Sequence, residues 1–281
     1  LDGPVRLIPG QWRALWCSID TTVEPAGEYP VTVRILVEGE KVAEETFSFR
    51  LLPCALPPQR LLFTQWFHAD CIAHQYGETV FSPRWWELTE RYVSFAAQHG
   101  MNMLLTPLFT PPLDTLPGTE RLTVQLVDVK KTAQRWEFGY DRLGQWIAMC
   151  KRCGIAYLEA SHLFTQWGAE HAPKIMAEVD GKQERVFGWE TDAEGEAYQD
   201  FLKAFLPDVT AFFKKEGMEG KVWFHVSDEP SAEHLERYGR LSALIHSLTE
   251  GYPKMDALSD YAFYEKGLVD VPVCATNHIA P

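Results

Sequence analysis

The sequence has few basic side chains for its length of 281 residues. It contains 26 lysines and arginines against 39 aspartates and glutamates, which gives a formal net charge of −13. Proteins that bind nucleic acid need a basic face to neutralise phosphates, so this balance argues against such a partner. The chain also lacks an apolar run of about 18 residues, the length that spans a bilayer, so we expect no membrane partner. No basic and apolar leader opens the sequence.

Cysteine is scarce and scattered, with six residues in the whole chain. Several lie in apolar runs such as LWCSI and VPVCAT, which predicts reduced, buried thiols rather than a disulfide framework. Cys150 and Cys153 form one Cys-x-x-Cys pair, and no second pair completes a zinc site. We interpret them as small residues near the end of a helix that stops at Gly154. Reduced thiols favour a cytoplasmic location, with secretion as the alternative because the sequence begins at Leu1 rather than at methionine.

The first part of the chain has the period of β structure. Val31, Val33, Ile35 and Val37 are apolar at every second position, and a turn follows around Gly39. This pattern predicts a hairpin over residues 30–52 with one buried face. The segment WRALWCSID predicts another strand, and the proline-rich PCALPPQ at 53–59 is typical of a linker. We expect residues 1–60 to form part of a β-sandwich, since such domains usually need about 100 residues.

From residue 61 onward, short apolar strands alternate with helices, which the sequence predicts over 82–100, 141–154, 195–216 and 231–248. Repeated βα units are typical of an α/β protein with a parallel sheet. No glycine-rich phosphate loop follows the first strand, which argues against a dinucleotide-binding sheet. Polar and aromatic residues recur after the strands, where (β/α)8 barrels build their active sites. We therefore predict that residues 61–281 form a TIM-type (β/α)8 barrel. Only about six strands can be counted, so the expected barrel is incomplete.

Two adjacent carboxylates, Asp228 and Glu229, directly follow the apolar strand KVWFHV. Burial and a neighbouring like charge both disfavour ionisation, so one carboxyl should keep a proton near neutral pH while the other stays charged. Acid-assisted bond cleavage requires that difference. Pro230 allows a bend, without which consecutive side chains would point to opposite faces. The alternative is that the pair caps the helix that begins near Ser231. We interpret His225, inside the strand, as a core histidine satisfied by hydrogen bonds.

Aromatic and polar residues gather in the predicted loops around this strand end. HLFTQWGAEHAPK carries His162 and Trp167, and FTQWFHAD carries Trp66. Aromatic rings pack against the C–H faces of a sugar while the sugar hydroxyls need hydrogen bonds. The mixture therefore indicates a sugar site, although core packing explains any single tryptophan equally well.

Several segments, taken in order, strongly resemble glycoside hydrolase family 123. They are HGMNMLLTPLFTPPLDT, SHLFTQWGAEHAPKI, FHVSDEPS, DALSDYAFYEKGLVD and ATNHI. The resemblance runs from about Leu61 to the last residue, and the preceding β region fits the family's N-terminal sandwich. It implies a β-N-acetylgalactosaminidase whose adjacent Asp–Glu pair corresponds to Asp228 and Glu229. We expect neither a cofactor nor a catalytic metal.

The mechanism that the resemblance implies is substrate-assisted, an exception to the usual two-carboxylate scheme. The 2-acetamido oxygen of the sugar attacks the anomeric carbon. Asp228, ionised, holds the amide N–H and stabilises the oxazolinium-type intermediate. Glu229, protonated, donates to the leaving oxygen and then activates water, so the anomeric configuration is retained. Because neither carboxylate attacks the sugar, two neighbours suffice.

Supporting roles follow from position at the strand ends. Tyr261 or Tyr264 is a candidate to bind the acetamido carbonyl. Contacts with the sugar are expected from His162, Trp167, Asn277 and Trp66. The sequence does not choose between a galacto and a gluco substrate, and it does not give the oligomeric state.

Two other interpretations remain open at this point. One is a metal-dependent barrel lyase, hydrolase or isomerase with ligands at the strand ends, drawn from His162, Asp228, Glu229 and His278. The other is a non-catalytic carbohydrate-binding protein that kept the fold. The intact Asp–Glu pair argues mildly against the latter.

Overall fold

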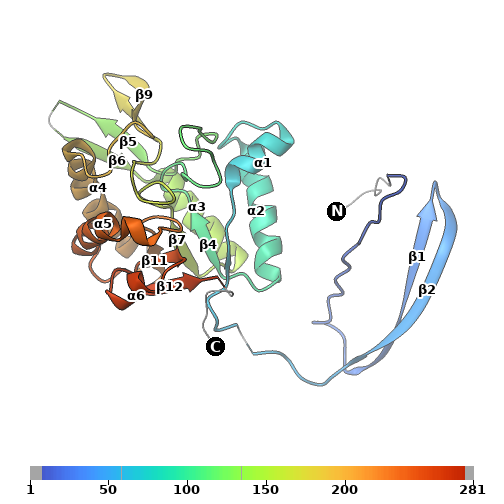
Figure 1. Cartoon of the computed structure of the whole chain (residues 1–281). Helices are drawn as coiled ribbons and strands as arrows, with labels where there is room; N and C mark the ends of the chain where they lie inside the picture. Colours follow the sequence, from blue (N-terminus) through green and yellow to red (C-terminus); the bar gives the residue numbers. More distant parts are fainter. Residues whose placement is uncertain (1–7, 58, 134, 276–281) are drawn as a thin grey trace. The chain divides into compact units, whose positions relative to one another are not determined.

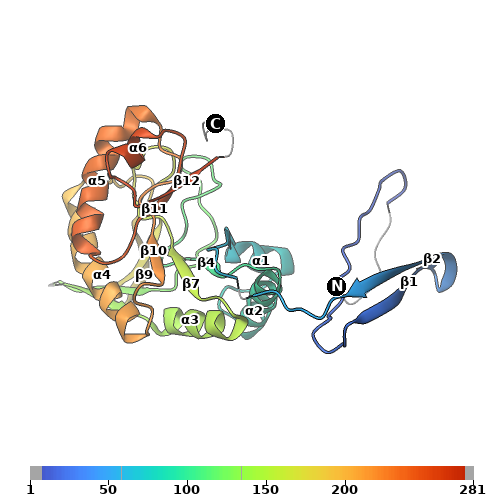
Figure 2. The same ribbon diagram turned by 90° about the horizontal axis from the view of Figure 1, so that it is seen from below.

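The computed structural model describes residues 8–57, 59–133 and 135–275. It consists of two compact units, Leu1–Pro58 and Gln59–Pro281 (Figures 1 and 2), and each is described by itself. Among the described residues, no helix combines the length and the hydrophobicity that a membrane crossing requires.

The first unit contains the predicted hairpin. Strands β1 (Gly27–Val37) and β2 (Glu40–Leu51) pair antiparallel, and Glu38 and Gly39 turn the chain with positive φ angles of 50° and 89°. Two positive φ angles in a two-residue loop match the right-handed twist of the flanking strands. The hairpin is therefore confirmed.

Two further predictions for this unit are wrong. The segment WRALWCSID forms no strand, and the hairpin has no buried face, because Val33, Ile35 and Phe47 are 41%, 52% and 51% exposed. The physical reason is that the described residues of the unit supply no second layer to cover the apolar side chains. A two-stranded sheet by itself does not make a sandwich.

The second unit is a mixed α/β fold built on parallel strands. Strands β3 (Thr64–Gln65), β4 (Met103–Thr106), β7 (Tyr157–Ala160) and β10 (Val222–Phe224) form one sheet in that order. Strands β11 (Met255–Leu258) and β12 (Val271–Cys274) also pair in parallel. A parallel bridge between Phe224 and Lys254 joins the two sheets. Six parallel strands thus follow one another in chain order, although β3 is much shorter than predicted.

The four predicted helices begin and end close to the expected positions. They are α2 (Pro83–Gln98), α3 (Asp141–Cys153), α4 (Glu196–Lys215) and α5 (Leu235–Leu248), and the 3₁₀ turn η1 (Ala232–His234) precedes α5. Two shorter helices, α1 (Ala69–Tyr76) and α6 (Ala262–Glu265), were not predicted. Ser82 accepts the Trp85 N–H and caps α2, and Gly154 ends α3 with a φ of 88°. Tyr140 is the residue before α3, and its side chain caps none of the helix N–H groups. Figure 2 shows α3, α4 and α5 on the outer side of the strands.

A second sheet was not predicted. Strands β5 (Asp128–Lys131), β6 (Trp136–Gly139), β8 (Ile175–Val179) and β9 (Lys182–Phe187) are ordered β6-β5-β8-β9. They are insertions: β5 and β6 lie between β4 and α3, and β8 and β9 lie between β7 and α4. Aromatic residues anchor them to α4, since Phe201 contacts Trp136, Phe138 and Phe187.

All six cysteines are free, so the prediction of reduced thiols is confirmed. The prediction that they are buried is wrong for four of them, because only Cys150 is buried and Cys153 is half-buried. Cys17 and Cys54 lie in the first unit, where no second layer covers them. The other two exposed thiols are Cys71 and Cys274.

Candidate active site

A buried histidine connects two carboxylates from neighbouring strands. His225 Nδ1 lies 2.9 Å from Asp256 Oδ1, and His225 Nε2 lies 2.9 Å from Glu159 Oε2. Carboxylates only accept hydrogen bonds when ionised, so both ring nitrogens carry hydrogen and the ring is a cation. Burial alone lowers the pKa of His225, but the hydrogen bonds to Asp256 and Glu159 outweigh it and raise the pKa to about 9. The interpretation of His225 as a hydrogen-bonded core histidine is confirmed.

Asp256, in β11, holds the backbone that leads to the carboxylate pair. Its carboxylate accepts the N–H of Val226 at 3.1 Å and that of Ser227 at 3.3 Å, as well as the hydroxyl of Tyr238. Burial raises the pKa of Asp256, and the hydrogen bonds from His225 and Tyr238 oppose that effect. These contacts fix the chain one residue before Asp228.

Glu159, in β7, is the other end of the buried network. It accepts hydrogen bonds from the Thr64 hydroxyl, from Trp66 Nε1 at 3.2 Å and from His225. Burial raises the pKa of Glu159, but these donors outweigh burial and leave it below its ordinary value. The indole N–H of Trp66 is therefore used inside the protein, and its ring lies edge-on to His162 at 5.3 Å.

Asp228 and Glu229 differ from this network because their carboxylates have no protein partner. Neither forms a hydrogen bond or an ion pair with any residue that the structure describes, although Asp228 is only 8% exposed. Ser231 starts the 3₁₀ turn without a side-chain cap, so the helix-capping alternative is wrong. Burial first, and then the charges of Glu229 and Asp256, raise the pKa of Asp228 to about 7.

The bend that was expected at Pro230 occurs one residue earlier. Glu229 has a φ of 45°, in the left-handed region that costs a residue other than glycine about 1–3 kcal/mol. Its N–H donates to the carbonyl of Ala257 at 3.2 Å. Trp167, with a φ of 64°, donates its N–H to the carbonyl of Asp228 at 2.8 Å. Backbone contacts from two other segments therefore hold the carboxylate pair in a strained conformation.

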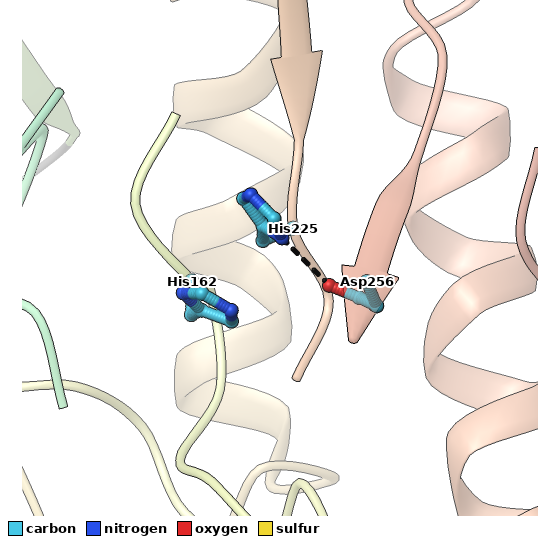
Figure 3. A group of neighbouring side chains, drawn as sticks. All are labelled: His162, His225 and Asp256. Carbon is cyan, nitrogen blue, oxygen red and sulfur yellow. Dashed lines mark hydrogen bonds and ion pairs between the residues drawn. The ribbon is translucent and has the colours of Figure 1, made fainter. Parts of the chain in front are cut away.

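His162, two residues after β7, is completely buried and neither of its ring nitrogens has a partner among the described residues. Its ring stacks on His225 with the centroids 4.2 Å apart, and Figure 3 shows the two rings side by side with Asp256 next to His225. Burial, and then the charge of His225, lower the pKa of His162. His162 is therefore neutral, with one donor nitrogen and one acceptor nitrogen free for a ligand or water.

The other predicted site residues lie on the surface or outside the described part of the chain. Trp167 is 48% exposed, and Tyr261 and Tyr264, after β11, are 69% and 44% exposed. Asn277 and His278 lie outside the described residues. Sequence reasoning missed Glu159 and Asp256. Their signal is a charge inside an otherwise apolar strand, in YLEA and MDAL.

The metal interpretation was tested against the donor atoms. His162, His225 and Asp256 each offer one ligand atom, and these atoms lie within 4.8 Å of one another (Figure 3). However, a protonated His225 has no lone pair to give, and Asp256 is already committed to several donors. Among the described residues, Asp228 and Glu229 do not join His162 in such a group. The described residues of this ligand set therefore do not come together as a metal site, and its remaining member, His278, lies outside the described residues.

An open hollow of about 780 Å³ lies beside Trp66. Its walls combine aromatic and polar side chains, among them His68, Asp70, Tyr76 and Tyr92. His68 Nε2 is 2.7 Å from Asp114 Oδ2, and the charge of Asp114 also acts on Asp228. Asp228 and Glu229 do not line this hollow.

A mixed α/β fold with two adjacent carboxylates at the end of a parallel strand, of which Asp228 has a raised pKa, is typical of an enzyme that works by acid–base catalysis. The family model described as "Glycoside hydrolase 123, catalytic domain" matches residues 66–281. The chain therefore belongs to glycoside hydrolase family 123, as its motifs predicted.

Solved structures agree with the fold. The chain is similar to a family 123 glycoside hydrolase from Clostridium perfringens, described in connection with glycolipid glycan hydrolysis. The two share 17% sequence identity and a TM-score of 0.65, over 91% of this chain and 46% of that chain. This chain thus spans less than half the length of that relative.

Other solved structures are less similar to this chain. They include a family 2 member from Bacteroides cellulosilyticus, with 14% identity, a TM-score of 0.38 and coverage of 88% of this chain and 27% of that chain. A β-glucuronidase from Parabacteroides merdae has 12% identity and a TM-score of 0.39, over 88% of this chain and 25% of that chain. No curated protein matches the sequence.

Proposed function

We propose that the protein is a retaining glycoside hydrolase that removes terminal β-linked N-acetylgalactosamine, or a related 2-acetamido sugar, by substrate-assisted catalysis. The observation that carries the proposal is the Asp228–Glu229 pair, whose carboxylates have no partner among the described residues and follow a strand end in a family 123 domain. Strained, buried and unsatisfied groups of this kind are typical of functional sites.

The electrostatics suggest how Asp228 changes state. Its pKa of about 7 leaves it partly protonated before substrate binds. The amide N–H of a 2-acetamido sugar donates to the ionised form, and the positive ring of the intermediate attracts it, so both favour loss of that proton. Asp228 is then the anion that orients the acetamido group. Glu229, which is exposed to solvent, donates a proton to the leaving glycosidic oxygen and later takes a proton from the attacking water.

Sugar recognition is assigned to the groups around the pair. His162 has a free donor and a free acceptor for hydroxyl groups, and the half-exposed ring of Trp167 suits a sugar C–H face. Tyr261 and Tyr264 are candidates for the acetamido carbonyl. Trp66 lines the adjoining hollow. Asn277, which lies outside the described residues, is a further candidate for a contact with the sugar.

The six parallel strands in chain order also favour a larger architecture. We propose that they belong to a (β/α)8 barrel, with residues 61–281 as catalytic domain, and that the hairpin in residues 1–60 is part of a β-sandwich. A barrel places its active site at the carboxyl ends of its strands, which agrees with the position of Asp228 and Glu229.

The direct test compares sugars with and without the acetamido group. Full-length protein should hydrolyse p-nitrophenyl β-N-acetylgalactosaminide at least about 10²-fold faster than p-nitrophenyl β-galactoside, because an internal nucleophile has a high effective molarity. The β-N-acetylglucosaminide determines the preferred configuration, and NMR of the first product should show a retained anomer. Similar rates on the plain galactoside would exclude the acetamido group as nucleophile.

The pH dependence follows from the pKa of Asp228. The proposed anion is lost as pH falls, so kcat/KM should drop by about tenfold per pH unit below about pH 7, since kcat/KM reports the free enzyme. The limb in kcat should lie at lower pH, because bound substrate favours the ionised form. Asp114→Asn, which removes a nearby negative charge, should move the kcat/KM limb to lower pH. A flat profile between pH 5 and 8 would contradict the assignment.

A further inference from the structure

The buried network of Glu159, His225 and Asp256 has no part in the bond-breaking steps proposed above. Their side chains are 0%, 1% and 0% exposed. The network nevertheless joins β7, the end of β10 and β11, and Thr64 of β3 and Tyr238 of α5 also donate to its carboxylates. Three ionised groups removed from water are costly unless each is paired. The position of this network next to the candidate site therefore indicates that it has a role there.

We propose that His225, held as a cation between Glu159 and Asp256, is a positioning residue that fixes the orientation of Asp228 and keeps its carboxyl group ionisable. The inference rests on the proposed function and deepens it. His225 touches neither the sugar nor the bond that breaks. It acts through Asp228.

The positional part of the argument is a chain of hydrogen bonds. His225 donates to Asp256, and Asp256 accepts the backbone N–H groups of Val226 and Ser227, which lead to Asp228. The Ser227 hydroxyl donates to the carbonyl of Thr165 at 2.8 Å. Without a charged donor, Asp256 would be a buried anion held mainly by neutral donors, so the backbone before Asp228 would lose its anchor.

The electrostatic part depends on the charges that act on Asp228. The interactions with Glu229, Asp256 and Asp114 raise the pKa of Asp228, and the interaction with His225 lowers it. His225 itself faces Glu159 in β7, Asp256 in β11 and the neutral ring of His162. Loss of the charge of His225 therefore removes a contribution that favours the ionised form of Asp228.

The test uses two near-isosteric variants of the full-length protein, His225→Gln and Glu159→Gln. Both should fold by circular dichroism and lower kcat on the 2-acetamido substrate by at least about tenfold. His225→Gln, which removes the cation, should also move the acid limb of kcat/KM to higher pH. Thr64→Val removes a neutral donor from Glu159 and controls for simple loosening of the network, so it should leave the limb in place.

A double variant separates positioning from general destabilisation. In an Asp228→Asn background, His225→Gln should cause little further loss of activity, because groups that act through one another are not additive. Losses that multiply, together with an unmoved acid limb, would overturn the inference. The proposed function would fail separately, in the wild type, if the acetamido preference were absent.

A measurement that needs no catalytic turnover also tests the inference about His225. It uses the wild type, so it does not depend on the folding of a variant. Nitrogen-15 NMR of the histidine rings in the wild type should show both nitrogens of His225 protonated at pH 7.5 and those of His162 in the neutral form. A neutral His225 at that pH would overturn the inference whatever the kinetics.

Discussion

Glu229→Gln is expected to lower kcat on a natural disaccharide with a terminal β-linked 2-acetamido sugar by about 10²–10⁴-fold, the usual contribution of a general acid. On the p-nitrophenyl glycoside the loss should be much smaller in the step that expels the leaving group, since p-nitrophenolate departs with little protonation. The side chain is exposed and its carboxylate has no described partner, so the fold should tolerate the change. Parallel kinetics on the two substrates measure the difference.

The matched control for this prediction is Glu236→Gln, which makes the same change at an exposed position on α5. It should leave both substrates unaffected. If Glu229→Gln lowered kcat equally on the disaccharide and on the p-nitrophenyl glycoside, Glu229 would not be the group that protonates the leaving oxygen. Its proposed role would then pass to another residue.

The alternation of strands and helices after Leu61 was predictable because its signals are local. Ser82 caps α2, and glycine in the left-handed region ends α3 at Gly154, and both are visible within a few residues of sequence. The sheet β6-β5-β8-β9 was not predictable in the same way. Its strands carry charged side chains such as Lys130 and Glu178, and their apolar residues become meaningful only against the aromatic face of α4.

Within the candidate site too, local features were predictable from the sequence and long-range contacts were not. Asp228 and Glu229 are adjacent in sequence, so their mutual repulsion could be anticipated. The network below them could not, because Asp256 lies 31 residues after His225 and Glu159 lies 66 residues before it. A charge in the middle of an apolar strand indicates that a partner exists, but only the pairing of β7, β10 and β11 identifies the partner.

The buried network and Asp228 differ in whether their polar groups have hydrogen-bond partners. Glu159, His225 and Asp256 are fully buried and satisfied by one another, as a stable interior requires. Asp228 is nearly as buried and has no described partner, a condition that lowers stability and is retained where a ligand supplies the missing contact. The hydrogen-bonded network therefore holds the unpartnered Asp228 in place.

Asp228→Asn is accordingly expected to have opposite effects on activity and on stability. Loss of the anion should lower kcat on the 2-acetamido substrate by about 10²–10³-fold, the usual result of removing one preorganised electrostatic contact. It should also abolish the acid limb of kcat/KM near pH 7. The folded-state pKa of about 7 lies above the unfolded value of 3.8, so the folded protein loses stability as pH rises between them. Asparagine cannot ionise, so the variant should have a higher Tm than the wild type at pH 8.

The pH dependence of that gain makes the prediction specific. The difference in Tm should shrink as pH falls from about 7 to 3.8 and should vanish below 3.8, where the wild-type carboxyl is protonated in both the folded and the unfolded state. Asp200→Asn, an exposed carboxylate on α4, serves as the control and should show neither effect. An Asp228→Asn variant that is less stable at pH 8 would mean that the carboxylate is structurally paired in solution, and Asp228 would then not be free to serve a substrate.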